Sequence, residues 1–383
     1  MLCITGTRAD YGIFRPLLFE INKDAAFSLQ LVATGMHLVA DYGYTLEGIR
    51  KDPFPIIATP SILLKGDSLY AMSQSVGMGI VYFSDIFHYH KPDVLLILGD
   101  RGEMLAAAIA AHYQNIRIVH LHGGEISGSA DDAVRHAVSK LAHLHFVSTL
   151  QAKRNLVMLG EEEWRVVPVG SLQKREIERI RHLAEEEKQL LIDKYQLASM
   201  GKKILLAMHP DSKDPLSFES QIGAVLEALG EIGDGGIIII GPNSDAGGDL
   251  FRERLLAYAG QGRHCHYFSS IPVEEYLFLL SQADVMIGNS SSGIIEAPFF
   301  GLPFVNVGDR QKGRDQGDNV VNVPYQADVI REAICLSLKE SNRKKGKNPY
   351  ELFDSPELEV VRQLKRLVNM PDVLHKKLVT WPD

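Results

Sequence analysis

Short apolar runs alternate with segments of helical periodicity along the first half of the chain. The apolar runs end at a Gly, a His or a polar loop, as buried strands do, and they span residues 2–5, 29–33, 94–98, 116–120 and 165–169. The segments that predict helices lie between them and include residues 13–21, 101–113 and 131–143. Strands and helices in alternation predict a parallel sheet with crossover helices.

The pattern stops and then restarts in the second half. Residues 170–201 are rich in charge and include Glu185, Glu186 and Glu187, which predicts a solvated helix and a connector. Strands then follow at residues 203–208, 236–240, 285–288 and 303–307, with helices that include 221–229 and 273–280. We therefore predict two doubly wound parallel-sheet domains of Rossmann type, at 1–170 and 171–355, and a total of 383 residues suits two domains.

Composition and charge narrow the class of protein. Hydrophobic residues make up 45% of the chain and charged residues 23%, enough apolar material for two cores. A formal charge of −8 argues against nucleic-acid binding but leaves room for a local basic pocket. Cys3, Cys265 and Cys335 form no CxxC pair, which favours a reducing, cytoplasmic location. The N-terminus lacks a signal-peptide pattern, and without an apolar run of roughly 20 residues we expect no membrane insertion.

Ligands of doubly wound sheets bind beyond the carboxyl ends of the strands, so the loops after the predicted strands are the places to seek chemistry. These loops are Thr-Gly-Thr-Arg-Ala-Asp at 5–10, Thr-Gly-Met-His at 34–37, Gly-Asp-Arg at 99–101, His-Gly-Gly-Glu at 122–125, His-Pro at 209–210, Gly-Pro-Asn at 241–243 and Gly-Asn-Ser-Ser-Ser-Gly at 288–293.

The loop at 288–293 resembles a diphosphate cradle. Ser290 and Ser291 offer hydroxyls and backbone N–H groups at the start of a predicted helix, whose dipole favours an anion. Simple N-capping explains the same residues equally well. Glu296 could accept hydrogen bonds from a ribose, or it could lie on a solvated helix face.

Basic residues could bind the same anion from other loops. Arg8 follows the first strand, and Arg310, Lys312 and Arg314 fall within five positions of the run Gly-Asp-Arg-Gln-Lys-Gly-Arg at 308–314. A solvated basic turn is the alternative for that run. His209 directly precedes Pro210 at a strand end, where it could donate to phosphate or transfer a proton.

Carboxylates gather in the first half. Asp100 follows an apolar strand and a glycine, where a carboxylate is costly to bury unless it is paired or used. Arg101 could hold it ionised or contact phosphate. Asp131 and Asp132 open a predicted helix, either as favourable first-turn charges or with one of them as an acid or base partnered by Arg135.

Other chemistries lack support in the sequence. His120 with His122, and His264 with His266, suggest zinc, but neither pair has a second pair of ligands at a suitable spacing. The chain has no GxGxxG fingerprint after the first strand, no GxxxxGK[ST] loop and no GxSxG elbow. We therefore expect neither a dinucleotide cofactor nor a bound metal.

Taken together and in order, the loops resemble those of the hydrolysing UDP-N-acetylglucosamine 2-epimerases of sialic-acid and related nonulosonic-acid biosynthesis. The resemblance spans nearly the whole chain and rests on the motifs at 6–12, 34–37, 41–43, 99–101, 122–125, 135–140, 209–210, 288–293 and 308–314. It implies a GT-B-like fold with an interdomain cleft, a C-terminal helix at 356–383 that returns to the first domain, no cofactor, and a homodimer or homotetramer.

The resemblance also implies a reaction and its residues. UDP leaves carbon 1 as a proton leaves carbon 2, and water then adds to the glycal to give N-acetylmannosamine. Asp100 and Asp131 would be the acid/base carboxylates, with His122 or Glu125 as a further candidate. His209 is a further catalytic candidate that would also help to hold the diphosphate. The candidate substrate-binding residues are Arg8, Arg101, Arg135, Asn243, Ser290, Ser291, Glu296 and Arg314.

Several alternatives stay open. Similar enzymes act on UDP-N,N'-diacetylbacillosamine in legionaminic-acid synthesis. Non-hydrolysing relatives carry a Thr-Glu-Arg-Pro-Glu-type sequence where this chain has 308–314, which favours the hydrolysing branch here. A GT-B glycosyltransferase would share the UDP cradle without needing the carboxylates, and so would a nucleotide-sugar sensor.

Overall fold

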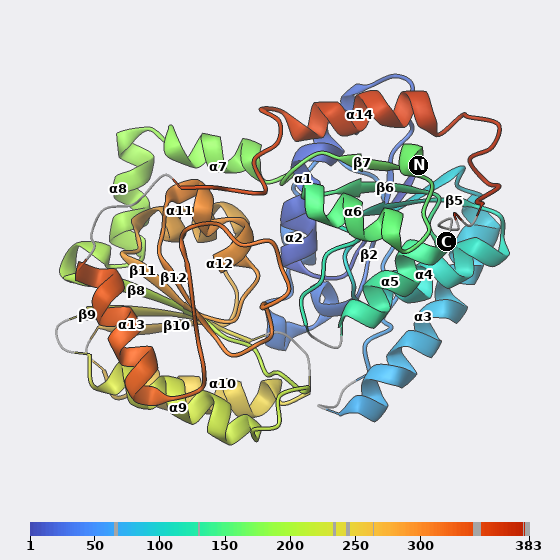
Figure 1. The fold of residues 1–383 in the computed structure, drawn as a ribbon. Coiled ribbons are helices and arrows are strands. Elements are labelled where there is room, and N and C mark those ends of the chain that lie inside the picture. Colours follow the sequence, from blue (N-terminus) through green and yellow to red (C-terminus); the bar gives the residue numbers. More distant parts are fainter. Residues whose placement is uncertain are drawn as a thin grey trace. The chain divides into compact units, whose positions relative to one another are not determined.

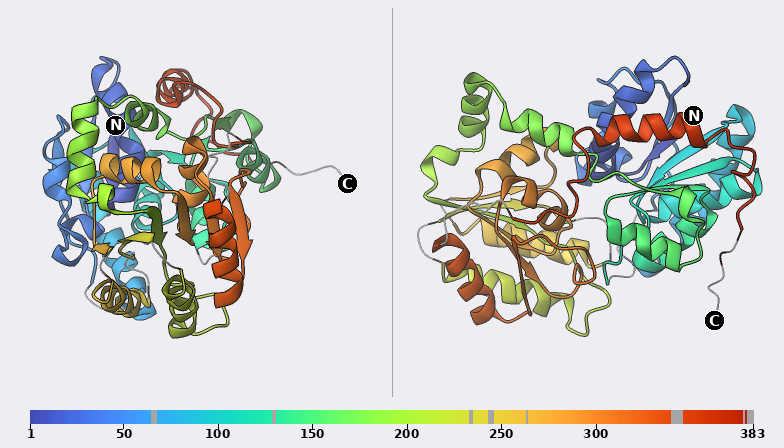
Figure 2. Two further views of the ribbon diagram at one scale, coloured as in Figure 1. Left: turned by 90° about the vertical axis from the view of Figure 1, so that its left-hand side faces the viewer. Right: turned by 45° about the horizontal axis from the view of Figure 1, so that its top comes forward.

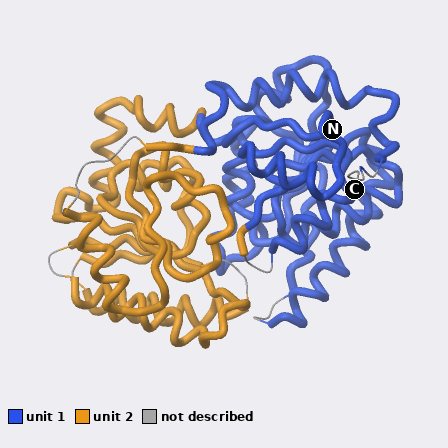
Figure 3. Tube along the Cα trace, in the orientation of Figure 1, with its two compact units in different colours: residues 1–126, 130–174, 349–383 blue, residues 127–129, 175–348 orange. Residues whose placement is uncertain are grey.

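The computed structural model describes residues 1–64, 68–128, 131–232, 235–242, 246–262, 264–339, 346–377 and 379. The chain divides into two units, coloured separately in Figure 3. Unit 1 comprises Met1–Ile126, Ala130–Lys174 and Pro349–Asp383, and unit 2 comprises Ser127–Ser129 and Arg175–Asn348. The chain thus leaves unit 1 after Lys174 and returns to it at Pro349, ahead of the C-terminal helix.

Among its described residues, unit 1 contains one parallel sheet in the order β3-β2-β1-β4-β5-β6-β7 (Figure 1). Its strands are β1 (Leu2–Thr5), β2 (Gln30–Ala33), β3 (Ile56–Ala58), β4 (Val94–Leu98), β5 (Arg117–Leu121), β6 (Leu144–Val147) and β7 (Val166–Pro168). Its helices are α1 (Arg8–Lys23), η1 (Gly35–Leu38), η2 (Ala40–Tyr42), α2 (Leu46–Ile49), α3 (Leu69–His90), α4 (Gly102–Tyr113), α5 (Asp131–Leu141), α6 (Leu150–Met158), η3 (Glu163–Arg165) and α14 (Pro356–Leu367).

Helices cover both faces of this sheet, and because successive strand residues point to opposite sides, neighbouring residues of one strand belong to different cores. On β4, Leu96 joins a cluster with α1 and α14, whereas Leu95 and Ile97 join another cluster with α3, α4 and α5. The continuous apolar run of β4 follows from this, since neither face meets water.

The C-terminal helix lies beside the N-terminal one. The views of Figures 1 and 2 agree that α14 and α1 are neighbours, and Val360 and Leu364 share a core with Phe14 and Leu18. The helix predicted at 356–383 is shorter than expected and ends at Leu367, after which residues 371–374 form turns.

Unit 2 repeats the design. Its described residues form a parallel sheet in the order β10-β9-β8-β11-β12-β13. Its elements are α7 (Lys174–Arg181), α8 (Glu185–Lys194), η4 (Leu197–Ser199), β8 (Lys202–Ala207), α9 (Phe218–Gly230), β9 (Gly235–Ile240), α10 (Gly248–Ala259), β10 (Cys265–Phe268), α11 (Val273–Gln282), β11 (Val285–Gly288), α12 (Ser292–Ile295), η5 (Ala297–Phe300), β12 (Phe304–Val307), β13 (Val320–Val323) and α13 (Ala327–Lys339).

One face of the second sheet carries the core formed with α9, α10 and α13. Ile204, Leu206 and Ile287 from the central strands meet Val225 and Ile334 there. On β8, the intervening Leu205 points to the opposite face and is equally buried. The prediction of two doubly wound parallel sheets is therefore confirmed. The structure adds the strand order, which begins 3-2-1-4-5-6 in each sheet when its own strands are numbered along the chain.

Shorter elements differ from the predictions for physical reasons. The strands β3, β10 and β13 lie at sheet edges and are only partly buried, so they lack a continuous apolar run. A buried His145 interrupts the apolar run of β6. Helix α1 begins at Arg8, earlier than the predicted 13–21, because Thr7 and Asp10 form a capping box. No helix among the described residues is long and apolar enough to cross a membrane.

Candidate active site

The strand order of each sheet reverses at its first strand, and ligands of doubly wound sheets bind at that point. In unit 1 the reversal lies between β1 and β4, which carry the loops with Arg8 and with Asp100. In unit 2 it lies between β8 and β11, which carry the loops with His209 and with Ser290. Arg8 and Asp100 therefore lie in loops at the reversal point of unit 1, and His209 and Ser290 in loops at that of unit 2.

The loop after β1 turns tightly into α1. The buried Asp10 accepts hydrogen bonds at Oδ2 from the Gly6 and Thr7 backbone N–H groups, at 3.1 and 3.0 Å, and at Oδ1 from the Thr5 hydroxyl. Burial raises the pKa of Asp10 to about 6, although these donors oppose the shift. Asp10 is thus a cap that holds the loop in place, and it sets Arg8 at the first position of the helix.

Two further side chains support this loop, and the sequence did not single them out. His37 bridges the Thr5 hydroxyl, 2.9 Å from Nε2, and the Thr45 hydroxyl, 2.7 Å from Nδ1. Burial lowers the pKa of His37 to about 4, so the ring is neutral. Glu103 lies buried with its Oε2 3.6 Å from Arg101 Nε. The Thr-Gly-Met-His motif alone could have signalled His37.

The carboxylate after β4 is held by a guanidinium from α5. Arg135 is fully buried and forms an ion pair with Asp100, whose side chain is 23% exposed. Its Nη1 also donates to Asp132 Oδ1 at 2.6 Å and to the Glu125 carbonyl at 3.0 Å. Asp100 therefore pairs with Arg135, and Arg101 lies against Glu103.

Helix α5 begins with two acidic residues, and one of them joins this group. Asp131 is its first residue, and Asp132 is the one paired with Arg135, three positions along the same helix. The sequence left open which of these two carboxylates Arg135 would partner, and the resemblance named Asp131 as the catalytic one. Asp100 and Arg135 are brought together as a unit, with Asp131 next to Asp132 along the helix.

The turn at 122–125 lies next to the same group. His122 adopts a left-handed conformation with φ +59°, which is uncommon for a residue with a side chain. Its Nδ1 lies 3.8 Å from Glu125 Oε1, and Glu125 also accepts a hydrogen bond from Ser148. Both side chains are buried, so this turn presents a His and a carboxylate beside the Arg135 group.

In unit 2, the side chain of Asn289 joins the loops after β8 and β11. Its Oδ1 accepts from the His209 backbone N–H, and its Nδ2 donates to the His209 carbonyl, both at 2.8 Å. Asn289 is fully buried, so this reciprocal pair fixes the backbone of His209 relative to Ser290 and Ser291.

The run at 308–314 docks on the same residue. Arg310 and Gln311 donate to the Asn289 carbonyl at 3.2 and 3.0 Å, and Arg314 Nε donates to Gln311 Oε1 at 2.6 Å. Lys312 is exposed and pairs with Asp309. The alternative of a solvated basic turn therefore holds for Lys312 but is wrong for Arg310.

The Ser-rich loop opens a helix that is shorter than expected. Helix α12 has four residues and continues as the 3₁₀ helix η5, so its dipole can contribute little to anion binding. Glu296 ends this helix, and the alternative of a solvated helix face is wrong because the side chain is buried. Burial raises its pKa to about 7, and its Oε2 meets no hydrogen-bond partner among the described residues. Asn243 lies outside the described residues.

These geometries suit different tasks. Unit 1 offers carboxylates held by the buried guanidinium of Arg135, with the His122 imidazole beside Glu125, and acid/base chemistry requires such fixed groups. Unit 2 offers hydroxyls, two docked guanidinium groups and a buried carboxylate oxygen, which match a diphosphate and the hydroxyls of a ribose.

Comparisons with known proteins show the family of the chain. The chain is 40% identical over 349 residues to UDP-N,N'-diacetylbacillosamine 2-epimerase (hydrolyzing) of Legionella pneumophila, covering 90% of this chain and 89% of the relative. It is 36% identical over 384 residues to GDP/UDP-N,N'-diacetylbacillosamine 2-epimerase (hydrolyzing) of Campylobacter jejuni, covering 99% and 98%.

Solved structures share the fold. The crystal structure of Methanocaldococcus jannaschii UDP-GlcNAc 2-epimerase in complex with UDP-GlcNAc and UDP matches with a TM-score of 0.79, at 18% identity, over 95% of this chain and 99% of that one. This likeness confirms the GT-B-like fold class and, at such low identity, nothing finer. Residues 19–357 match the family model described as UDP-N-acetylglucosamine 2-epimerase. The chain belongs to the UDP-N-acetylglucosamine 2-epimerase family and is an enzyme that epimerises a UDP-sugar at carbon 2.

Proposed function

We propose that the enzyme is a hydrolysing 2-epimerase, which converts a UDP-2-acetamido sugar and water into the free 2-epimeric sugar and UDP. The observation that carries the proposal is the group formed by Asp100, Arg135 and Asp132 at the reversal point of unit 1. Sugar transfer or simple binding has no need of fixed carboxylates, whereas removal of a proton from carbon 2 requires a positioned base.

The reaction has two stages. A base takes the proton from carbon 2 as the bond between carbon 1 and the UDP oxygen breaks, which leaves a glycal. Water then adds its hydroxyl to carbon 1, and an acid returns a proton to carbon 2 on the opposite face. Two groups on opposite sides of the ring are needed, and we assign these roles to Asp100 and Asp131, with His122 or Glu125 as the alternative source of the second proton.

Unit 2 would hold the nucleotide. Ser290, Ser291 and Arg314 suit the diphosphate, because the serines follow β11 and Gln311 orients the guanidinium. The buried Oε2 of Glu296 suits the ribose hydroxyls, which would supply the missing donors. Arg8, Arg101, His209 and Asn243 stay candidates for contacts to the phosphates or the sugar, on sequence grounds.

Two observations support the hydrolysing branch and point to a substrate. The run Gly-Asp-Arg-Gln-Lys-Gly-Arg at 308–314 resembles the corresponding loop of that branch, and both relatives described above carry "hydrolyzing" in their names. Because both are also named for diacetylbacillosamine, we place UDP-N,N'-diacetylbacillosamine first and UDP-N-acetylglucosamine, named in the family description, second. Three cysteines without a disulfide among them fit the cytoplasmic location expected from the sequence.

A direct comparison of the two nucleotides tests the proposal. Purified enzyme is incubated with each UDP-sugar, and UDP and the free sugar are quantified over time for the wild type and for Asp100→Asn. We expect equimolar UDP and free 2-epimer, a larger kcat/KM for the diacetylbacillosamine nucleotide, and a loss of kcat of about 10²–10⁴-fold in Asp100→Asn. UDP-linked 2-epimer without free sugar would place the enzyme in the non-hydrolysing branch, and near-wild-type turnover by Asp100→Asn would refute the role of Asp100.

A further inference from the structure

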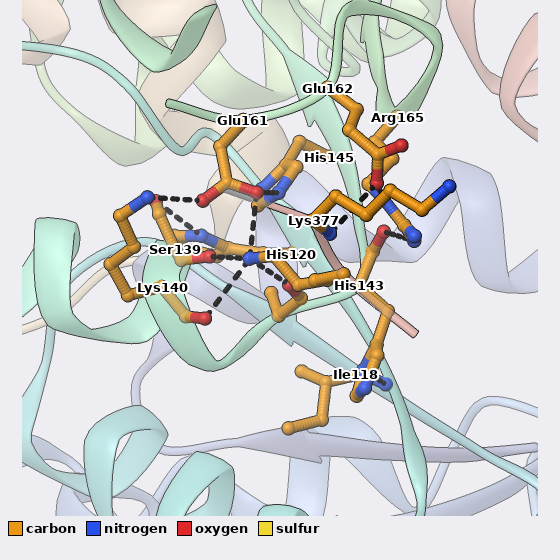
Figure 4. Close-up of polar contacts among 12 residues, drawn as sticks. Ile118, His120, Ser139, Lys140, His143, His145, Glu161, Glu162, Arg165 and Lys377 are labelled. Atoms are coloured by element: carbon orange, nitrogen blue, oxygen red, sulfur yellow. Dashed lines mark hydrogen bonds and ion pairs between the residues drawn. The ribbon is translucent and has the colours of Figure 1, made fainter. Parts of the chain in front are cut away.

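A buried histidine in unit 1 contacts two of the elements that carry the proposed catalytic residues. His120 lies on β5 with no exposed surface. Its Nε2 is 2.7 Å from the Gly99 carbonyl oxygen, and its Nδ1 is 3.1 Å from the Ser139 hydroxyl. Gly99 directly precedes Asp100, and Ser139 belongs to α5, the helix of Asp131 and Arg135. Figure 4 shows His120 beside Ser139 and His145.

The hydrogen bonds of His120 can run in only one direction. Burial lowers its pKa to about 3, so the ring is neutral and carries a single N–H. A carbonyl oxygen can only accept, so this N–H is on Nε2 and points to Gly99. Nδ1 is then an acceptor for the Ser139 hydroxyl. The ring therefore joins α5, through Ser139, to the turn at Gly99 by two hydrogen bonds of defined direction.

The turn that carries Asp100 is held through both backbone polar groups of Gly99. Gly99 has φ +80°, a conformation that favours glycine, and its N–H donates to the Leu121 carbonyl at 2.9 Å. With the carbonyl bonded to His120, both backbone polar groups of this residue are occupied. The direction in which the next residue, Asp100, leaves the turn is set by these two bonds.

The turn at 122–125 rests on the same pair of side chains. A Cβ atom at Gly123 would lie 2.8 Å from His120 Nδ1 and 2.9 Å from Ser139 Oγ. Gly123 therefore packs directly over the hydrogen bond between His120 and Ser139. The position of the turn with His122 and Glu125 therefore depends on this pair. The His120 imidazole thus contacts the Gly99 turn, α5 and the 122–125 turn, the three segments that carry the acid/base residues.

The C-terminal segment fixes α5 from its other end. Lys376 Nζ donates to the carbonyls of Ser139 and Ala142, at 3.2 and 2.7 Å, near the C-terminus of that helix. The same ammonium pairs with Glu161 at 2.7 Å, and Glu161 holds His145 at 3.2 Å. The rings of His145 and His120 stand edge to face with centroids 6.4 Å apart.

We propose that His120 is a positioning residue for the epimerisation: it links the Gly99 turn to α5 and so sets the separation of Asp100 and Asp131. The expected effect on catalysis rests on the proposed function, because it assumes that these two carboxylates act on the sugar. His120 itself touches no substrate, since its side chain is enclosed by the turn, the helix and His145.

The test compares two buried histidines of the same unit. His120→Leu removes both hydrogen bonds. His143→Leu is the matched control, because His143 is also buried, with its pKa lowered by burial to about 4, but its Nδ1 accepts from the Ile118 backbone, away from the acid/base group. His120→Gln keeps an N–H that can reach Gly99, and Ser139→Ala removes only the second bond, so both are informative if His120→Leu does not fold.

We expect similar falls in Tm for the two leucine variants but different kinetics. His120→Leu should lose about 10²-fold in kcat, the cost of misplacing a catalytic group by about 1 Å, with UDP affinity unchanged. His143→Leu should keep kcat, His120→Gln should recover most of it, and Ser139→Ala should lose an intermediate amount. Unchanged kcat in His120→Leu, or an equal loss in His143→Leu, would overturn the inference; if His120→Leu does not fold, unchanged kcat in Ser139→Ala would do so.

Crystal structures of the same variants separate this inference from the proposed function. If the wild type turned over neither UDP-sugar, the proposed function would fail, and the position of the 99–101 turn would still decide the role of His120. A shift of the Asp100 carboxyl away from Asp131 in His120→Leu, absent in His143→Leu, would support the inference. An unmoved turn in His120→Leu would overturn it.

Discussion

Breaking the ion pair between Asp100 and Arg135 should affect stability far more than breaking an ion pair on the surface. Arg135 is 1% exposed and also serves Asp132 and the Glu125 carbonyl. Arg135→Met leaves two carboxylates and a carbonyl in a partly buried site without this donor. Loss of a buried charge partner costs about 3–5 kcal/mol, which is a large share of the roughly 5–15 kcal/mol that a domain has.

The coupling between the two side chains is smaller than the cost of Arg135→Met. Asp100→Asn keeps an acceptor for Arg135 but replaces a charge-assisted hydrogen bond with a neutral one, a loss of about 1–2 kcal/mol. In the double variant, Arg135 no longer supports position 100, so the effect of the Asn disappears. A double-mutant cycle should therefore give a coupling of about 1–2 kcal/mol.

The assay is hydrogen exchange of α5 peptides in increasing urea, read by mass spectrometry. It follows unit 1 by itself, which matters because a chain of two units need not unfold in one step. The control cycle uses Glu47 and Arg50 on α2, an i,i+3 pair at 2.6 Å with side chains 61% and 53% exposed. Such exposed pairs couple by about 0.3–0.5 kcal/mol. A coupling for Asp100 and Arg135 no larger than the control would refute the reasoning.

Three further predictions address unit 2 and the C-terminal segment. Burial raises the pKa of Glu296 to about 7, so UDP binding to its ionised form should release protons below pH 7. Calorimetry in two buffers measures this release, and Glu296→Gln should release fewer protons. Unit 2 should also lose stability as pH rises from 4.5 through about 7, and Glu296→Gln should not show this pH dependence. Gln311→Ala should weaken UDP binding about tenfold, because Arg314 loses its orienting acceptor at 2.6 Å, and unchanged affinity by titration would contradict this role. Arg165→Met should destabilise unit 1 by about 3–5 kcal/mol in urea unfolding. The reason is that the buried guanidinium donates to four backbone carbonyls, three of them in the C-terminal segment. A destabilisation as small as that of Arg50→Met would contradict this prediction.

The sequence predicted the sheets well because their central strands are buried on both faces. Continuous apolar runs such as Val94–Leu98 follow directly from that burial, and the parallel order then places every following loop at the same edge of its sheet. For this reason the apolar pattern alone was enough to select the loops of Asp100, His209 and Ser290 as candidate sites.

Pairings between loops could not be predicted in the same way. Periodicity says that Arg135 faces the first turn of α5, but not that it reaches Asp100, 35 positions earlier in the chain. Nor does it say which carboxylate of the Asp131 and Asp132 pair it meets. Burial of a polar residue is equally hidden, because the apolar residues on either side of Glu296 did not show whether its carboxyl points to the interior or to solvent.

His120 illustrates the limit most clearly. In the sequence it is one member of a His-Leu-His run that suggested a metal and then received no role. Its function in the fold comes from a carbonyl 21 positions before it and a hydroxyl 19 positions after it. Only the register of β4 against β5 and the packing of α5 bring these three groups together.

Proton NMR of the reaction in deuterium oxide tests the central claim, that proton transfer at carbon 2 is coupled to the loss of UDP. The enzyme is incubated with each UDP-sugar while UDP, the free sugar and the carbon 2 signal are followed. We predict one UDP for each free 2-epimer and a deuterium at carbon 2 of the product. A free sugar that keeps its original proton and configuration at carbon 2 would contradict the account, because it would show hydrolysis without epimerisation.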